Sequence, residues 1–192
     1  MSINDVKLCY KEFGEKYNDI NSTFNCCSYY DSKPKKEFVS NKTSCINFDK
    51  VKEHINKLYK SVDSLYLSEN KNTAYFIEFK NSTYKNVHND LVEKAIKSTI
   101  IHHNVCKLSR YDDYENCVVC VLSFDKALES NPLTNIYIKN AGYLDGLNIS
   151  DLENSFKNQF YRDKNDDVLP FEYDSFKIIF DKNFDTFVNQ IV

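Results

Sequence analysis

The stretch 117–124 constrains the fold more than any other part of this chain, because its sequence CVVCVLSF is apolar except for Ser123. A half-buried strand alternates apolar and polar residues, whereas a strand buried on both faces reads as a continuous apolar run. The stretch also has the length of a typical strand. We therefore expect it in the middle of a sheet. The expected fold class is α/β, with a mixed sheet as in α+β proteins.

Apolar residues at helical and strand spacings predict most of the other elements. Helices are predicted at 4–17, 48–60, 86–103 and 184–191. Strands are predicted at 62–67, 73–79, 135–139 and 171–180. The first two of these strands form an antiparallel hairpin. The helix at 86–103 carries Leu91 and Ile100 on its apolar face, and Asp90 and Lys94 on its polar face.

Side chains that favour helix starts and loops mark the boundaries between these elements. Asn47 is suited to cap the helix that follows it, and the capping box Ser150-Asp-Leu-Glu153 predicts a further helix start. The stretch 18–44 is rich in Asn, Ser and Lys and is interpreted as a loop. The stretch 163–167 is interpreted as an acidic, exposed loop.

Length and cysteine usage favour a single cytoplasmic domain. The 192 residues fit one domain, 1–192, which is long enough to bury a sizeable core. The chain has no apolar run of about 20 residues, which is the length needed to cross a membrane, and residues 1–16 lack the apolar core of a secretory signal. Seven cysteines at irregular spacing favour free thiols in a reducing compartment over a disulfide framework.

Cysteine and histidine give little support for a zinc site. Cys117 and Cys120 have the spacing of a zinc knuckle or a redox pair, but their apolar surroundings favour buried strand cysteines. Adjacent His102 and His103 diverge by about 100° on a helix, which is a poor arrangement for sharing a metal ion.

The charged residues are distributed unevenly, although the net charge is only −3. Residues 1–110 contain 18 Lys and Arg against 13 Asp and Glu, a charge of +5, and residues 111–192 contain 7 against 15, a charge of −8. The basic first half permits contact with nucleic acid, and the acidic C-terminal third permits a protein partner. The uneven distribution of charge is equally compatible with solvent-exposed protein faces that bind no partner.

Two carboxylates and a lysine belong to the predicted hairpin. A side-chain period of two places Glu78 and Lys80 on one face of their strand, with Ile77 and Phe79 on the other. Asp63, on the partner strand, can point to the face of Glu78 and Lys80. Two carboxylates at a strand end suit Mg²⁺, which prefers oxygen ligands. A lysine beside them can orient a water molecule or neutralise charge in phosphoryl transfer.

The order of helix, strand with Asp63, strand ending in Phe-Ile-Glu78-Phe-Lys80, helix and buried strand resembles the PD-(D/E)XK nuclease superfamily, whose members share a restriction-endonuclease-like αβββαβ core. The FIEFKN strand is also similar to uncharacterised proteins of AT-rich prokaryotes. The resemblance covers about 45–124 and leaves 125–192 as a C-terminal extension with added helices and a strand.

This resemblance implies a nuclease that hydrolyses phosphodiester bonds of DNA or RNA with Mg²⁺ or Mn²⁺. Asp63 and Glu78 would be the metal ligands, and Asp63, Glu78 and Lys80 the catalytic residues. The first core helix would supply a third carboxylate. Glu53 is the candidate, although it lies nearly opposite the apolar stripe of its helix, and Asp49 is placed only marginally better.

Two alternatives to a nuclease stay open. One is a non-catalytic interaction module, such as a defence or immunity protein that keeps the nuclease-like fold. The other is an exposed pair, Glu78 and Lys80, on an unrelated sheet. Val62 stands where the family motif has its proline, a position that tolerates change in the superfamily.

Overall fold

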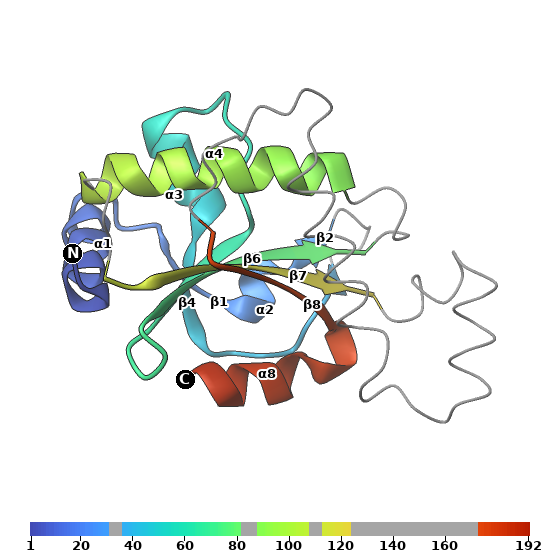
Figure 1. The fold of residues 1–192 in the computed structure, drawn as a ribbon. Helices are drawn as coiled ribbons and strands as arrows, with labels where there is room; N and C mark the ends of the chain where they lie inside the picture. Colours follow the sequence, from blue (N-terminus) through green and yellow to red (C-terminus); the bar gives the residue numbers. More distant parts are fainter. Residues whose placement is uncertain (31–35, 82–87, 108–112, 124–172) are drawn as a thin grey trace, which may run out of the picture.

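A six-stranded mixed sheet with the strand order β1-β4-β5-β6-β7-β8 forms the centre of the computed structural model (Figure 1). The structure describes residues 1–30, 36–81, 88–107, 113–123 and 173–192. The strands of the sheet are β1 (Asn21–Thr23), β4 (Ser44–Asn47), β5 (Ser64–Ser68), β6 (Thr73–Lys80), β7 (Glu115–Leu122) and β8 (Ser175–Phe180). A second, two-stranded sheet pairs β2 (Tyr29–Tyr30) with β3 (Lys36–Glu37). The predicted α/β fold with a mixed sheet is confirmed.

The sheet changes from antiparallel to parallel pairing at β6. Strands β4, β5 and β6 pair antiparallel, whereas β6, β7 and β8 pair parallel. The helix α4 (His88–Cys106) lies between β6 and β7 in the chain, as a parallel pair requires a crossover connection. Every residue of β7 after Glu115 is buried, and strands flank β7 on both sides, so its predicted central position is confirmed.

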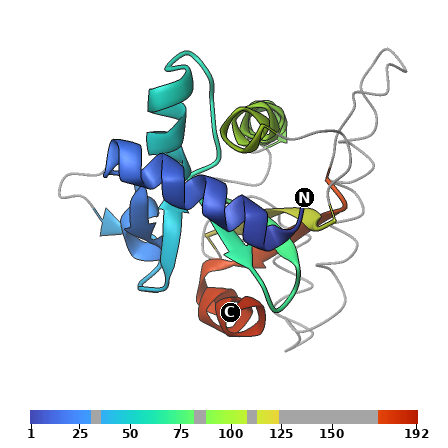
Figure 2. The same cartoon turned by 90° about the vertical axis from the view of Figure 1, so that its left-hand side faces the viewer.

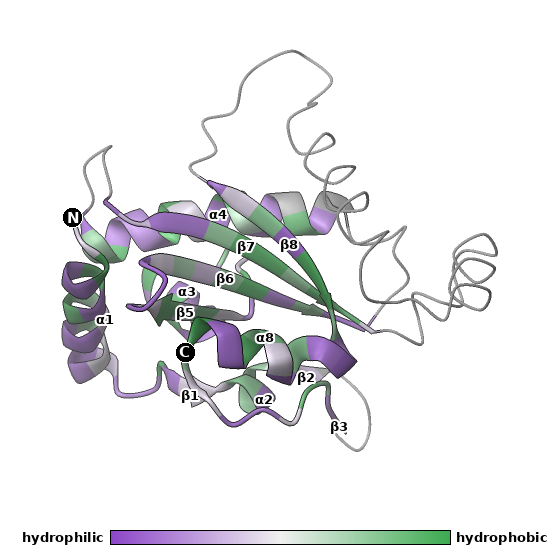
Figure 3. Ribbon diagram, turned by 60° about the horizontal axis from the view of Figure 1, so that its bottom comes forward, coloured by the Kyte–Doolittle hydropathy of each residue, from purple (hydrophilic) through white to green (hydrophobic). Residues whose placement is uncertain are grey.

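Helices cover both faces of the sheet (Figures 1 and 2). One face packs against α1 (Ile3–Tyr17), α3 (Phe48–Ile55) and α4, and the other against α2 (Phe24–Cys27) and α8 (Phe184–Ile191). A short 3₁₀ helix, η2 (Asp181–Asn183), precedes α8. Two separate hydrophobic cores result, and Figure 3 shows that β7 and β8 are hydrophobic toward their C-terminal ends.

Alternation along β6 assigns its side chains to the two cores. Ala74 and Phe76 belong to the core beneath α1, α3 and α4, whereas Tyr75 and Ile77 belong to the core beneath α8. The continuous burial of β6 from Thr73 to Glu78 follows from this double coverage.

The structure differs from the predicted elements in the stretch 18–44 and in α3. The stretch 18–44 was expected to be a loop, but it contains β1, α2, β2 and β3 and ends at Ser44, the first residue of β4. Ser22 of β1 lies opposite Cys45 of β4. These elements are two to four residues long, too short to produce a hydrophobic period. The predicted helix 48–60 ends at Ile55, because Asn56 is extended and the side chain of Leu58 is 92% exposed.

Other predictions are confirmed or fall outside the described residues. Asn47 caps α3, with its side chain accepting a hydrogen bond from the backbone N–H of Lys50, and α1 and α8 lie where they were predicted. The predicted strand 135–139, the capping box at 150–153 and the loop 163–167 lie outside the described residues. Within the described part of the chain, no helix has both the length and the hydropathy to cross a membrane.

A buried histidine joins two tyrosines in the core beneath α4. Nδ1 of His102 lies 2.8 Å from the hydroxyl of Tyr10, and Nε2 lies 2.7 Å from the hydroxyl of Tyr114. The residue is 1% exposed, and burial, assisted by the charge of His103, lowers the pKa of His102 to about 3. The imidazole is therefore neutral in the folded protein at pH 5 to 7.

Replacing His102 with glutamine should flatten the pH dependence of stability. Between about pH 6.5 and pH 3 the unfolded chain binds a proton at His102 that the folded chain does not, so acid favours unfolding by roughly 1 kcal/mol per pH unit. Urea unfolding at pH 7 and pH 5 measures this difference. The variant should lose less stability between these two pH values than the wild type, and an equal loss in both proteins would contradict the assignment.

Candidate carboxylate and lysine site

Glu78 and Lys80 lie near the C-terminal end of β6, on the side of the sheet that α4 covers. They continue the alternation of Ala74 and Phe76, whereas Phe79 packs against the opposite core. The prediction that Glu78 and Lys80 share a face is therefore confirmed. Glu78 is only 1% exposed, because β7 and α4 enclose it, whereas the Lys80 side chain is 18% exposed.

Asp63 lies immediately before β5, not within a strand as predicted, but it reaches the same place. Its Oδ2 atom accepts a hydrogen bond from the backbone N–H of Phe79 at 2.6 Å, between Glu78 and Lys80 in the sequence. The neighbouring backbone N–H of Val62 donates to the hydroxyl of Ser98 on α4 at 3.0 Å. These contacts fix the Asp63 carboxylate beside β6.

Lys94 of α4 bridges the two carboxylates. Its Nζ atom lies 2.7 Å from Oε1 of Glu78 and 3.8 Å from Oδ1 of Asp63. The Nζ atom of Lys80 lies 2.8 Å from the same Oε1 atom of Glu78. The structure thus brings Asp63, Glu78 and Lys80 together and adds Lys94 as a fourth member.

Further ion pairs connect this group to the surface. Lys80 donates to Oδ2 of Asp90 at 2.5 Å, and Lys60 lies 3.3 Å from Oδ1 of Asp90 and 2.7 Å from Oε2 of Glu93. The Lys60 side chain is 49% exposed. A continuous series of ion pairs therefore runs from the buried Glu78 through Lys80 and Asp90 to the exposed Lys60.

Burial and charge pairing shift the titration of these groups in a consistent way. Burial, together with the negative charge of Glu78, raises the pKa of Asp63 well above its usual range, against the opposing effects of Lys94 and the Phe79 N–H. Burial disfavours the charged form of Lys94, but the carboxylates of Glu78 and Asp63 outweigh it and raise the pKa of Lys94. Two carboxylates thus share one firmly protonated ammonium group.

One carboxylate oxygen of Glu78 has no partner among the described residues. Oε2 is buried and accepts no hydrogen bond, whereas Oε1 contacts both Lys80 and Lys94. A buried carboxylate oxygen without a partner is costly, so such an atom calls for an explanation. A water molecule or a metal ion would satisfy it.

The two carboxylates suit a divalent cation that takes only one or two of its ligands from the protein. The described residues contain no group of three or more His, Cys, Asp and Glu side chains arranged to hold a metal ion. Mg²⁺ nevertheless binds through one or two carboxylates plus water and phosphate oxygens. Asp63 and Glu78 meet that minimum, with the ammonium group of Lys94 as the competing cation.

The predicted third carboxylate, Glu53, lies elsewhere. Its Oε2 atom pairs with Lys50 on the same helix, 2.8 Å away, and its side chain is 45% exposed. Asp49, which accepts a hydrogen bond from the hydroxyl of Ser61 at 2.6 Å, is the acidic residue of α3 that contributes to the raised pKa of Asp63, behind burial and Glu78. Asp49, and not Glu53, is therefore the acidic residue of α3 whose charge acts on Asp63.

Asp90 and Lys94 were predicted on the polar face of α4, and the structure places their side chains in the charged cluster, 35% and 19% exposed. The buried side of α4 runs through Leu91, Ala95 and Ser98, whereas Ile100, expected on the apolar face, is 37% exposed. Lys94 stands three residues after Leu91, at the edge of this buried side. Leu91, Ala95 and Ser98 follow the helical spacing of a buried stripe. Because Ser98 is polar, a search for apolar residues at that spacing does not find it.

Cys117 and Cys120 form no pair. Both are buried, but Cys117 belongs to the core beneath α8 and Cys120 to the core beneath α4, where it lies opposite Glu78 in the β6–β7 register. Their separation of three residues along a strand places them on opposite faces. Their interpretation as buried strand cysteines is confirmed.

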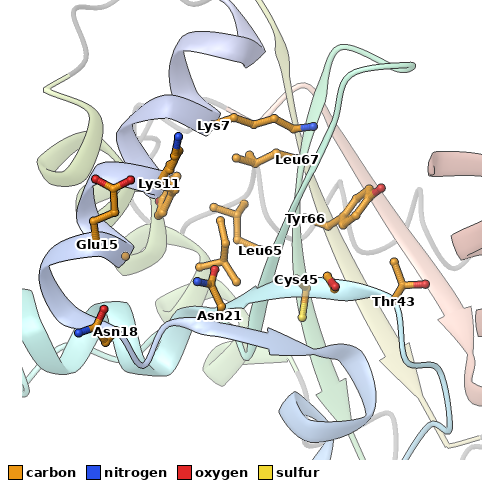
Figure 4. Close-up of a pocket in the computed structure, with 14 residues that line it drawn as sticks. Lys7, Lys11, Glu15, Asn18, Asn21, Thr43, Cys45, Leu65, Tyr66 and Leu67 are labelled. Atoms are coloured by element: carbon orange, nitrogen blue, oxygen red, sulfur yellow. The ribbon is translucent and has the colours of Figure 1, made fainter.

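A groove of about 810 Å³ lies between α1 and the strands β1, β4 and β5 (Figure 4). Leu65 and Leu67 contribute its apolar wall, and Lys7, Lys11 and Glu15 its rim on α1. Its described lining does not include the three predicted site residues.

Comparison with known proteins gives no relative for this chain. No family model matches the chain, and neither a curated protein nor a solved structure matches it.

Proposed function

We propose that Asp63 and Glu78 hold a Mg²⁺ or Mn²⁺ ion and that the protein hydrolyses phosphodiester bonds of nucleic acid at this site. The observation that carries the proposal is the convergence of two carboxylates, one just before β5 and one on β6, of which Glu78 is 1% exposed and has an unpartnered oxygen. A purely structural charge cluster gains nothing from an unsatisfied carboxylate oxygen at its centre. A bound cation would neutralise that oxygen.

Each side chain of the site has a distinct part in this proposal. Bound divalent metal supplies charge neutralisation at the phosphate and lowers the pKa of a water molecule. Asp63 and Glu78 would bind the ion, with Asp63 oriented by the Phe79 N–H. Lys80, which is 18% exposed and held by Asp90, would face the reacting phosphate and stabilise its developing charge.

The succession of elements supports the resemblance to PD-(D/E)XK nucleases. The chain runs from α1 through the antiparallel strands β4, β5 and β6 to α4 and the parallel strand β7. This is a helix, three strands, a helix and a strand, with β1, α2, β2 and β3 inserted before β4 and α3 inserted before β5. On this correspondence the core would begin at α1 and not near residue 45.

Substitution of Glu78 by glutamine tests the proposed activity. With Mg²⁺ or Mn²⁺ present, wild-type protein should cleave at least one substrate among single- and double-stranded DNA and RNA. Glu78→Gln should reduce the rate at least about 100-fold, because it removes a metal-ligand charge while keeping the side-chain shape. Gel electrophoresis of end-labelled substrates measures the cleavage.

Glu69 offers a matched control for this substitution. It lies in the turn between β5 and β6, its side chain is 57% exposed, and it pairs with Lys7. Glu69→Gln should cleave like the wild type. Equal rates for the wild type and Glu78→Gln, or no cleavage by wild type under any of these conditions, would reject a nuclease active at this site.

A second candidate function is a non-catalytic module that keeps the same fold. The ion pairs of Lys94 and Lys80 with Asp63, Glu78 and Asp90 favour it, because each of these three carboxylates already has a lysine partner without a metal ion. Such a protein would bind its partner through another surface. The acidic C-terminal third, expected to provide that surface, lies mostly outside the described residues. Failure of metal binding by a folded wild-type protein would favour this candidate.

A further inference from the structure

We propose that Cys27 and Cys45 form a reversible disulfide when the protein meets a low-molecular-weight disulfide such as oxidised glutathione. The two Sγ atoms, from the end of α2 and from β4, lie 3.7 Å apart. Both thiols are free in the structure. This oxidation site is independent of the carboxylate and lysine site.

The backbone around the two cysteines holds them in position for bond formation. The N–H of Phe24 donates to the carbonyl of Thr43 at 3.2 Å, and the N–H of Asn25 donates to the carbonyl of Asn41 at 2.8 Å. These bonds fix α2 against the residues that precede β4. An S–S bond of about 2.05 Å then requires the sulfur atoms to approach by less than about 2 Å, which side-chain rotation can supply.

The two thiols have different surroundings, which assigns them different roles. The hydrogen bond with Cys45 lowers the pKa of Cys27, against the effect of burial. The same hydrogen bond, together with burial, raises the pKa of Cys45. Cys27 is half-buried and Cys45 is 7% exposed. Cys27 is therefore the attacking thiolate, and Cys45 is the resolving thiol.

Oxidation proceeds by two thiol–disulfide exchanges. The Cys27 thiolate attacks one sulfur of the small disulfide, whose S–S bond breaks and releases one thiolate. Cys45 then gives its proton to that thiolate and attacks Sγ of Cys27, which expels the second small thiolate. That thiolate takes up from water the proton that Cys27 released on ionising. The protein loses two thiol hydrogens, and the small disulfide is reduced to two thiols.

The proposed bond alters the wall of the groove between α1 and β4. Cys45 lines this groove, as Figure 4 shows, whereas Cys27 does not. Disulfide formation draws the sulfur of Cys45 toward α2 and away from the groove. The neighbouring Cys26 is exposed and supplies the natural comparison, because a reaction governed by access alone would use it first.

Oxidation of the full-length folded protein by a series of glutathione redox buffers tests the proposal. After remaining thiols are alkylated, trypsin separates Cys45 from the peptide that contains Cys26 and Cys27, because Lys35 and Lys42 lie between them. Mass spectrometry should find the two peptides cross-linked, with the mass of two hydrogens lost. Cys26→Ser should form the same cross-link at the same buffer ratio, and Cys27→Ser should form none.

A control in denaturant excludes a cross-link that reflects sequence proximity alone. In urea the folded geometry is absent, so the Cys27–Cys45 cross-link should require a buffer at least about 10-fold more oxidising. A cross-link of the folded wild type that disappears in Cys26→Ser, no cross-link in the folded wild type, or equal formation with and without urea would each overturn the proposal. The wild-type measurement is decisive even if a variant fails to fold.

Discussion

Replacing Lys94 with methionine should lower the free energy of unfolding by about 3–5 kcal/mol in the absence of divalent ions. The ammonium group lies 2.7 Å from Glu78 and 3.8 Å from Asp63, and its side chain is 19% exposed. Its removal leaves the buried Glu78 carboxylate and the Asp63 carboxylate, which is 17% exposed, facing each other with only Lys80 as counter-charge. Breaking a buried ion pair from one side is costly, because the remaining charge stays desolvated.

Lys97 supplies the matched control for this prediction. It lies on the same helix, with its ammonium 5.2 Å from the ring centre of Tyr59, and it pairs with neither carboxylate. Lys97→Met should cost less than about 1 kcal/mol. Chemical denaturation measures both variants. If Lys94→Met and Lys97→Met lose equal stability, Lys94 does not neutralise the carboxylate pair.

Replacing Phe76 with alanine should lower the free energy of unfolding by about 3–5 kcal/mol. Phe76 is 1% exposed at the centre of β6, and its ring packs edge-on against Phe48, His102 and Tyr173 at centroid distances of 5.3 to 5.8 Å. The substitution would remove the contacts of β6 with Phe48 of α3 and with His102 of α4 and leave a cavity between the sheet and both helices. The loss combines lost apolar burial with the cost of the void.

The exposed Leu58 provides the contrast for Phe76→Ala. Its side chain is 92% exposed, so Leu58→Ala removes a large apolar group without opening a cavity and should change stability by less than about 0.5 kcal/mol. Denaturant unfolding of both variants checks the pair. A loss at Phe76→Ala no larger than that at Leu58→Ala would contradict the packing described for β6.

The parts of the fold that a hydrophobic period controls were predictable from the sequence. The helices α1 and α8 bury a stripe that repeats at the helical spacing. The strands β5, β6 and β7 are buried almost continuously and are recognisable as apolar runs of strand length. The same logic placed Glu78 and Lys80 on one face. Burial against a partner layer thus determines these elements more strongly than any single residue.

The remaining differences have local physical causes. In the stretch 18–44, backbone hydrogen bonds to distant residues, such as Asn47 N–H to Ile20 C=O at 2.7 Å, decide the structure and leave no period in the sequence. The predicted extension of α3 failed because Asn56 turns the chain into an extended conformation. Lys94 was missed as a member of the site because a lysine that pairs with Asp63 and Glu78 looks, in the sequence, like any solvated lysine on a helix.

Calorimetric titration with Mg²⁺ and Mn²⁺ tests the central proposal most directly, because it needs no knowledge of the substrate. Wild-type protein and Glu69→Gln should each bind one ion per chain at the site of Asp63 and Glu78, and Glu78→Gln should bind at least about 10-fold more weakly. Far-UV circular dichroism establishes that all three proteins are folded. Indistinguishable binding curves for the wild type and Glu78→Gln, or no heat of binding in either, would contradict the account.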